Sequence, residues 1–253
     1  MTLEIQNLSF SYGTHPILKN LSFRREGGGL TALLGENGSG KSTLLAALAG
    51  LRSRDGIFWN GRPLDEWTSG EQARFRALVP QHPRYDPTMT LYDYVFLGRK
   101  PWFRWKESTR DRDIVSREID RFNLGKLAFR SLSQISGGER QKAMLARAFA
   151  QDTPLLLLDE PLNNLDLRFR IEFMNALKQR ASDGTLVIVA LHDVNAALSW
   201  CHSAILMKDG AIITEGPAAQ ALTRESLRHM LGVEAHFYTV DGHRQMAAHR
   251  IIH

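Results

Sequence analysis

The segment from residue 35 to residue 42 has the residue types of a loop that holds phosphate groups. It matches the pattern GxxxxGK[ST] at every fixed position, between a predicted strand and a predicted helix. Its glycines let successive backbone N–H groups converge on an anion, and the helix directs its positive end at the same place. Lys41 is expected to reach the β- and γ-phosphates of a nucleoside triphosphate, and the Ser42 hydroxyl to bind Mg²⁺. The predicted nucleotide contacts are Gly35, Glu36, Asn37, Gly38, Ser39, Gly40, Lys41, Ser42 and Thr43.

Two adjacent acids, Asp159 and Glu160, follow the apolar stretch Leu155–Leu158. Ligands of a parallel sheet lie at the carboxyl ends of its strands, so both acids are expected beside the phosphates. Successive strand residues point to opposite faces, and the two acids should therefore differ in role. Asp159 suits Mg²⁺ through its water, whereas Glu160 suits polarising the attacking water. The structural alternative is a strand end that carries two solvated acids.

The segment Ser136-Gly137-Gly138-Glu139 has two interpretations. Ser136 can cap a helix, with Glu139 three residues later completing a capping box. A helix N-terminus with two glycines is also suited to an anion. Taken alone, the segment favours the capping box.

The elements that must position these residues follow an α/β pattern. Apolar strands are expected at Leu30–Leu34, Leu155–Leu158, Leu186–Ala190 and Ala204–Met207, and the phosphate loop leads into a helix over Lys41–Ala49. Strand and helix alternation around a helical insert indicates a parallel sheet with a small helical subdomain.

Other parts of the chain predict antiparallel strands and helices. Leu8, Phe10 and Tyr12 alternate with polar residues, and Ile17–Phe23 is again strand-like, so the chain should begin with antiparallel sheet. Asn60-Gly61 is a hairpin turn signal. Residues 88–150 read as helical, a helix face is expected from 169 to 177, and short strands are expected around Asp241-Gly242.

Composition indicates a soluble intracellular protein without an export signal. Hydrophobic residues make up 43% of the 253 residues, which allows a packed interior. No apolar run approaches the roughly 18 residues needed to span a bilayer. Cys201 is the single cysteine and cannot form an internal disulfide. The net charge of +5 is compatible with nucleic acid, anionic lipid, a nucleotide or simply an arginine-rich surface, and does not choose among them.

The order of these segments resembles the ABC ATPase family, whose hallmark is a signature such as Ser136–Glu139 between two nucleotide motifs. The resemblance covers nearly the whole chain. It implies a P-loop NTPase fold with a RecA-like parallel sheet core, an N-terminal antiparallel β subdomain and an inserted α-helical subdomain. The implied single ABC ATPase domain covers 1–253, with a core of about 1–87 and 151–253 and a helical subdomain of about 88–150.

The resemblance also assigns roles to single residues. Tyr12 matches the adenine-stacking aromatic, Gln81 the Mg²⁺-sensing glutamine, Asp166 the acid of the D-loop and His192 the switch histidine. The implied catalytic residues are Glu160, His192, Gln81 and Lys41, and the implied Mg²⁺ ligands are Ser42, Gln81 and Asp159. ATP is the implied nucleotide, contacted also by Tyr12, Asp166, Ser136, Gly137, Gly138 and Glu139.

The implied assembly is a homodimer in which each signature contacts the γ-phosphate bound by the other subunit. Its further partners would be two polytopic membrane permease subunits and a substrate-binding protein that acts through the permease. The expected location is the cytoplasmic face of the inner membrane, as a peripheral subunit, with no nucleic acid bound.

Two segments, Thr90–Trp102 and His192–Ala197, and the tail Leu231-Gly232-Val233 resemble the subfamily that serves importers of ferric siderophores, haem and cobalamin. An exporter ATPase is the nearer alternative. A nucleic-acid-associated ABC ATPase is more distant, because such relatives carry a second ATPase domain, a coiled coil or zinc modules.

Several features depart from the family pattern or stay open. Ile135 stands where leucine is commoner, which preserves volume. Asn163-Asn164 stands in the D-loop where small residues are frequent. Trp102, Phe103 and Trp105 suit either the core of the helical subdomain or contact with a membrane subunit. The tail histidines His243, His249 and His253 lack the spacing and acid partners of a metal site.

Overall fold

The computed structural model describes residues 1–103, 107–163 and 165–251, and its centre is a six-stranded sheet of order β10-β9-β3-β8-β7-β6. Neighbouring strands are parallel except β9 and β10. The carboxyl ends of β3, β7 and β8 therefore meet at one edge of the sheet. The strands are β3 (Leu30–Gly35), β6 (Arg76–Val79), β7 (Leu155–Asp159), β8 (Leu186–Ala190), β9 (Ser203–Lys208) and β10 (Ala211–Pro217).

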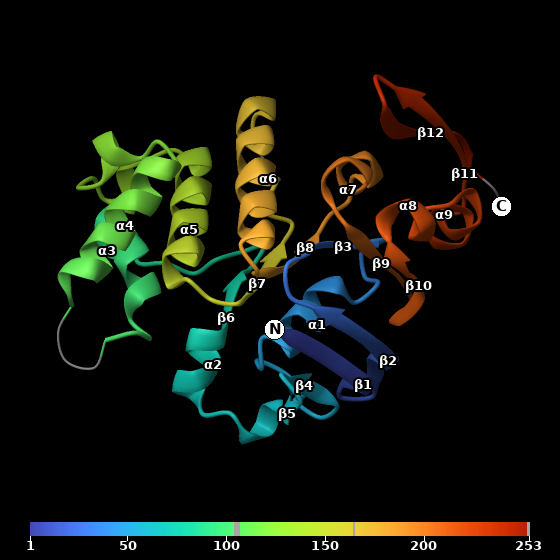
Figure 1. Ribbon diagram of the computed structural model, residues 1–253, viewed down its shortest axis with the longest axis horizontal. Coiled ribbons are helices and arrows are strands. Elements are labelled where there is room, and N and C mark those ends of the chain that lie inside the picture. Colours follow the sequence, from blue (N-terminus) through green and yellow to red (C-terminus); the bar gives the residue numbers. More distant parts are fainter. Residues whose placement is uncertain (104–106, 164, 252–253) are drawn as a thin grey trace.

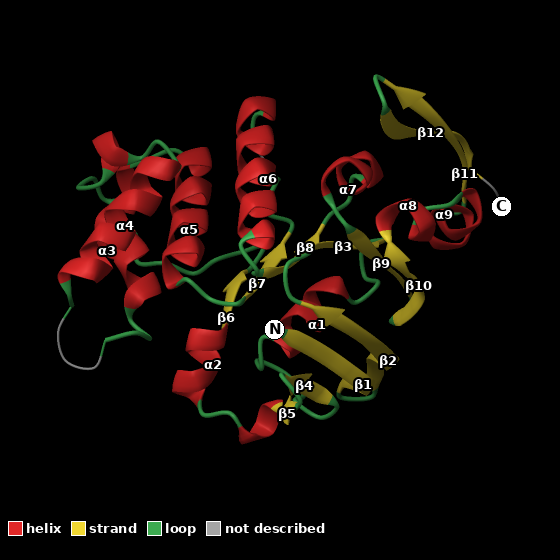
Figure 2. Ribbon diagram, viewed as in Figure 1, coloured by secondary structure: helices red, strands yellow, loops and turns green. Residues whose placement is uncertain are grey.

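Both faces of this sheet are buried, which explains its continuous apolar strands. In β7, Leu156 and Leu158 belong to the hydrophobic core on one face, and Leu155 and Leu157 to the core on the other. Figure 2 shows helices on both sides of the sheet, with α1 on the side opposite α6 and α7. These helices are α1 (Lys41–Leu48), α6 (Leu167–Ser182) and α7 (Val194–Trp200).

An antiparallel sheet of order β2-β1-β4-β5 lies on the α1 side, as expected from the N-terminal alternation. Its turn between β4 and β5 is formed by Asn60 and Gly61, whose φ values of 52° and 76° suit a hairpin turn. Trp59 stacks on Phe75 with ring centres 4.4 Å apart, which joins the sheet to α2. The elements are β1 (Thr2–Tyr12), β2 (His15–Glu26), β4 (Ile57–Trp59), β5 (Arg62–Pro63) and α2 (Ser69–Phe75).

The helical insert lies at one end of the molecule (Figure 1) and contains α3 (Leu91–Phe96), α4 (Thr109–Arg121) and α5 (Gly137–Gln151). A buried ion pair of 2.9 Å joins Arg99 to Asp111, and Arg99 also donates to the Ala150 carbonyl. These bonds fix the start of α4 against the end of α5. Short 3₁₀ turns connect the elements at Leu64–Glu66, Leu97–Arg99, Gly125–Leu127 and Leu132–Gln134.

The C-terminal part forms two short helices and a hairpin at the opposite end of the molecule (Figure 1). The helices are α8 (Ala218–Ala221) and α9 (Arg224–Leu231), and the hairpin strands are β11 (Val233–Val240) and β12 (His243–Ile251). The hairpin turns at Asp241 and Gly242, the position that the sequence predicts. Among the described helices, none has both the length and the apolar composition needed to cross a bilayer.

Candidate nucleotide-binding site

The phosphate loop joins the carboxyl end of β3 to α1 and needs glycine for both conformation and space. Gly38 and Gly40 have φ values of 84° and 101°, which residues with a Cβ rarely adopt. A Cβ on Gly40 would also lie 3.0 Å from Leu18 Cδ2 and 3.2 Å from the Ile17 carbonyl oxygen. The loop is therefore shaped by contact with β2.

Lys41 is buried and its ammonium group lies over its own loop. Its Nζ donates to the Gly35 carbonyl at 2.8 Å and to the Glu36 carbonyl at 3.1 Å. Burial lowers the pKa of Lys41, and the carboxylates of Glu160 and Asp159 oppose that shift. Phosphate oxygens in this loop would offer the ammonium anionic acceptors in place of these two carbonyl groups.

Glu160 is the point at which three separate segments meet. Its Oε1 lies 2.5 Å from Nε2 of His192, which follows β8. Its Oε2 accepts hydrogen bonds from Gln81 Nε2 at 2.8 Å and from Asn163 Nδ2 at 2.9 Å. Glu160 also has φ 51°, an uncommon left-handed conformation that the surrounding bonds hold in place. The hydrogen bond between Asn163 and Glu160 is not predicted by the sequence.

Asp159 lies one residue earlier and is buried. Its Oδ1 is a buried oxygen without a hydrogen-bond partner in the described part of the chain. Burial raises the pKa of Asp159, and the Ser42 hydroxyl is the largest influence that lowers it. A buried carboxylate oxygen with spare acceptor capacity, next to a hydroxyl, fits a small hard cation such as Mg²⁺.

A cavity of about 440 Å³ connects these residues. It brings the phosphate loop together with Gln81, Glu160 and His192, which come from three other loops. Ile17, which sequence reasoning missed, forms part of its wall through the contact between β2 and the phosphate loop. The lining residues are Ile17, Asn37, Gly38, Gly40, Lys41, Ser42, Thr43, Gln81, Glu160 and His192.

Tyr12 lies outside this lining, at the end of β1, with 49% of its surface exposed. Phe10 supports the ring edge-on at 4.9 Å, and Arg52 Nε donates to the Tyr12 hydroxyl at 2.9 Å. The turn after Tyr12 leads directly to the β2 segment that contains Ile17. The exposed ring is suited to stack on a base, and Arg52 is a neighbour that the sequence did not indicate.

The signature segment forms the capping box expected from its sequence. Ser136 caps α5 by accepting from the Glu139 N–H at 3.3 Å, and Glu139 Oε2 accepts from the Ser136 N–H at 2.7 Å. The hydrogen bond from the Ser136 backbone is the main cause that lowers the pKa of Glu139. None of residues 136–139 lines the cavity of the same chain. Asp166 similarly caps α6 by accepting from the Phe169 N–H.

The remaining candidate residues are placed as follows. Trp102 donates from its indole to the Gln151 carbonyl at 2.6 Å and stays 40% exposed. Phe103 packs 5.7 Å from Phe96 between ring centres. His249 in β12 stacks on His236. Trp105, Asn164 and His253 lie outside the described residues.

Comparison with known proteins gives a consistent result. Residues 18–163 match the family described as ABC transporter. An uncharacterized ABC transporter ATP-binding protein of Methanocaldococcus jannaschii is 36% identical over 96% of each chain. A hemin import ATP-binding protein of Bordetella pertussis is 39% identical over 93% of this chain and 94% of its own. A petrobactin import ATP-binding protein of Bacillus subtilis is 30% identical over 96% of this chain and 97% of its own.

Solved structures agree with this match. A transporter described as the metal-chelate ABC type, in an inward-facing conformation, superposes with a TM-score of 0.79 at 27% identity, over 98% of this chain and 96% of that one. A bacterial ABC transporter cassette solved as a dimer superposes with a TM-score of 0.77 at 26% identity, over 85% of this chain and 98% of that one. The fold expected from the sequence is therefore confirmed.

Proposed function

The chain belongs to the ABC transporter family, as an ATP-hydrolysing subunit, and we propose that it powers uptake of a metal chelate such as a ferric siderophore, haem or cobalamin. The observation that carries the direction of transport is the likeness to import ATPases over more than nine-tenths of each chain. The segments Thr90–Trp102 and His192–Ala197 support the same subfamily.

The proposed hydrolysis uses the residues that meet around the 440 Å³ cavity. The phosphate loop and Lys41 hold the β- and γ-phosphates, and Glu160 accepts a proton from the attacking water. His192 orients Glu160 and the γ-phosphate, since its Nε2 already lies beside the carboxylate. Ser42, Asp159 and Gln81 are suited to hold Mg²⁺, which supplies charge neutralisation at the phosphate oxygens. Tyr12 stacks on the adenine.

The active unit is proposed to be a homodimer with shared sites. The signature residues 136–139 lie outside the cavity of their own chain, while their helix N-terminus remains suited to an anion. A two-fold arrangement would place each signature against the γ-phosphate held by the partner. The related cassette solved as a dimer supports this arrangement.

A groove of about 630 Å³ between the sheet and the helical insert is the proposed docking site for the permease. Its wall combines apolar side chains such as Leu97 and Met144 with the basic side chains of Arg84, Lys100 and Arg147. Pro80 and Pro83 also line it, on either side of Gln81. A segment of a membrane subunit with an acidic side chain fits this wall, and its docking would press on the loop that bonds Glu160.

We further propose that two permease subunits hold the chain at the cytoplasmic face of the inner membrane. A substrate-binding protein would deliver the chelate to the permease from the other side. The chain itself would never contact the cargo.

Transport in vesicles tests this proposal. The chain is reconstituted with its permease and binding protein in proteoliposomes. ATP is supplied on the side of the membrane to which the chain is bound. We expect ATP-dependent movement of iron-55 haem, ferric siderophore or labelled cobalamin away from the binding protein, and none with Glu160→Gln. Movement toward the binding-protein side would support an exporter. Hydrolysis stimulated by DNA and weakened steeply by salt would support the nucleic-acid alternative.

A further inference from the structure

The C-terminal hairpin is joined to α7 by two hydrogen bonds from one side chain. Asn195 Oδ1 accepts from the Met246 N–H at 2.7 Å, and Asn195 Nδ2 donates to the Met246 carbonyl at 3.0 Å. An amide that bonds both backbone groups of one strand residue imitates the pairing of a neighbouring strand. Asn195 therefore fixes β12 against the first turn of α7.

The same turn of α7 carries the residues that follow His192. Asp193 caps α7 by accepting from the N–H groups of Asn195 at 2.8 Å and Ala196 at 3.3 Å. Because α7 has only seven residues, these bonds restrain a large part of it. His192 directly precedes the cap, and its Nε2 lies 2.5 Å from Glu160 Oε1. A continuous series of short contacts thus leads from Met246 to Glu160.

The hairpin is also attached on its α8 side. Phe237 and Met246 pack against the hydrophobic core, and the guanidinium of Arg244 lies 4.1 Å from the centre of the Phe237 ring. Arg244 in turn donates to the carbonyl groups of Ala219, in the first turn of α8, and of Leu222, its C-cap. The hairpin is therefore attached to α7 and α8 by these bonds, while β11 packs on the adjoining α9.

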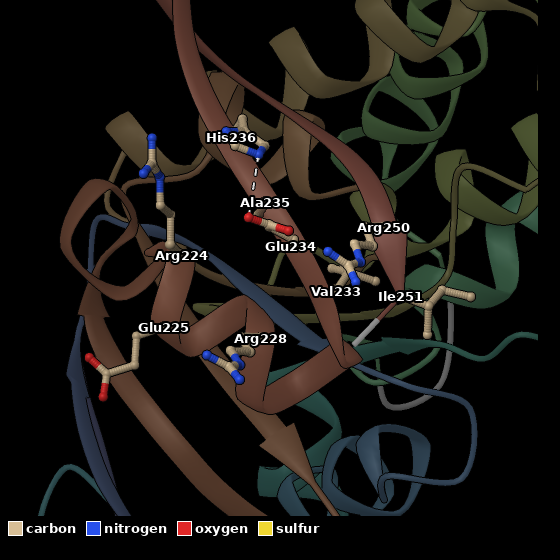
Figure 3. Close-up of a pocket in the computed structure, with 9 residues that line it drawn as sticks. All are labelled: Arg224, Glu225, Arg228, Val233, Glu234, Ala235, His236, Arg250 and Ile251. Atoms are coloured by element: carbon tan, nitrogen blue, oxygen red, sulfur yellow. Dashed lines mark ion pairs between the residues drawn. The ribbon is translucent and has the colours of Figure 1, made fainter. Parts of the chain in front are cut away.

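A hollow of about 840 Å³ opens between the hairpin and α9 (Figure 3). Arg224 and Arg228 project from α9 and Arg250 from β12 around it, and all three side chains are exposed. The hairpin thus borders a hollow beside α9 on one flank and bonds to α7 on another. A shift into the hollow would act on Asn195.

We infer that Asn195 is a positioning residue for hydrolysis, through which the C-terminal hairpin holds His192 beside Glu160. The inference rests on the proposed roles of those two residues. Loss of the amide releases α7 from β12, so His192 samples positions away from Glu160. Binding of ATP changes little, because the phosphate loop and Tyr12, which are proposed to hold most of the nucleotide, belong to other elements.

The test compares Asn195→Ala with Ser199→Ala, an exposed substitution on the same helix, in the full-length chain. We expect Asn195→Ala to lower kcat for ATP about tenfold while KM changes less than about twofold, since misplacing a catalytic group affects the reaction step. The imidazole resonances of His192, assigned with His192→Ala, should shift in Asn195→Ala and stay in place in Ser199→Ala.

Several outcomes separate this inference from the proposed function. A folded Asn195→Ala chain with wild-type kcat and unmoved His192 resonances overturns it, provided that His192→Ala is inactive. If His192→Ala hydrolyses ATP normally, the proposed role of His192 fails instead. Should Asn195→Ala not fold, Asn195→Asp is used instead, because it keeps the acceptor for the Met246 N–H. The His192 resonances of Asn195→Asp should then shift in the same direction by a smaller amount. Wild-type behaviour of that folded variant also overturns the inference.

Discussion

Gln81 donates a hydrogen bond of 2.8 Å to Glu160 across 79 residues of sequence. The bond joins the loop after β6 to the end of β7, and so links the wall of the proposed permease groove to the proposed catalytic carboxylate. A partner that moves this loop would change the environment of Glu160 without touching the nucleotide. The geometry therefore offers a direct route from docking to hydrolysis.

Replacing Glu160 by glutamine should stop hydrolysis while ATP still binds. The amide cannot accept a proton from water, so kcat should fall at least about a hundredfold. Because the γ-phosphate then persists, a dimer stable enough to isolate should form with MgATP. Hydrolysis assays and light scattering check both results, with the exposed Glu26→Gln as control. Wild-type turnover, or a monomer at saturating ATP, contradicts the assignment.

Tyr12→Ala should raise KM for ATP with little change in kcat. Stacking of an aromatic ring contributes about 1–2 kcal/mol, mostly as uniform binding, which corresponds to roughly a five- to thirtyfold higher KM. GTP should also be hydrolysed, because stacking reads the face of a base. Tyr12→Phe is the matched control, since it removes only the bond from Arg52. An unchanged KM in Tyr12→Ala would show that the ring serves packing alone.

A mixture of Lys41→Ala chains and Ser136→Arg chains tests the shared sites. If each signature serves the partner's phosphate, the heterodimer carries both lesions in one site and keeps the other intact. Residual hydrolysis should then exceed that of either mutant homodimer, provided that one intact site turns over alone.

Differential tags verify that the heterodimer forms. Adding Glu160→Gln to both chains converts the readout to trapped ATP, which needs no turnover. One nucleotide held per heterodimer supports the shared site, and none contradicts it.

Lys100→Glu should weaken association with the permease without affecting hydrolysis by the isolated chain. Lys100 is exposed in the basic wall of the groove, so reversing its charge opposes an acidic partner segment. The amount of permease that co-purifies with the chain should fall severalfold. Added salt should also reduce the amount that co-purifies with the wild-type chain. Lys126→Glu, an exposed lysine of the helical insert outside the groove, is the control. Equal loss in both variants would place the docking surface elsewhere.

Glu71 should give α2 a stability that depends on pH. Hydrogen bonds from the Thr68 backbone and hydroxyl, and then from Arg62, lower the pKa of Glu71 from 4.5 to about 2. A carboxyl whose pKa is lower in the folded state stabilises the fold above its unfolded value, and that contribution is lost as the pH falls toward 2.

Thermal unfolding of the wild type and Glu71→Gln measures this effect. The difference in Tm should be largest near neutral pH and shrink between pH 4.5 and 2. Asp65→Asn, a nearby exposed acid, is the control. A difference that is constant over this range would show that the charge of Glu71 does not matter.

Local sequence patterns determined most of the scaffold. Each of these patterns depends on residues within a few positions of one another. They are the phosphate loop, the apolar strands, the capping box at Ser136 and the hairpin turn at Asn60-Gly61. Both-face burial explains why β7 and β8 are continuously apolar and so easily recognised. The short elements β6 and α7 were missed, because four to seven residues contain too little periodicity.

Only the tertiary structure decided which distant residues meet. The bonds of Asn163 to Glu160, Arg52 to Tyr12 and Asn195 to Met246 depend on strand order and on loop paths. No local pattern encodes them, because an amide or guanidinium side chain forms such bonds wherever the fold happens to place a partner. The sequence by itself thus determined the chemical groups and the elements that bear them, whereas packing of the elements decided how those groups are connected.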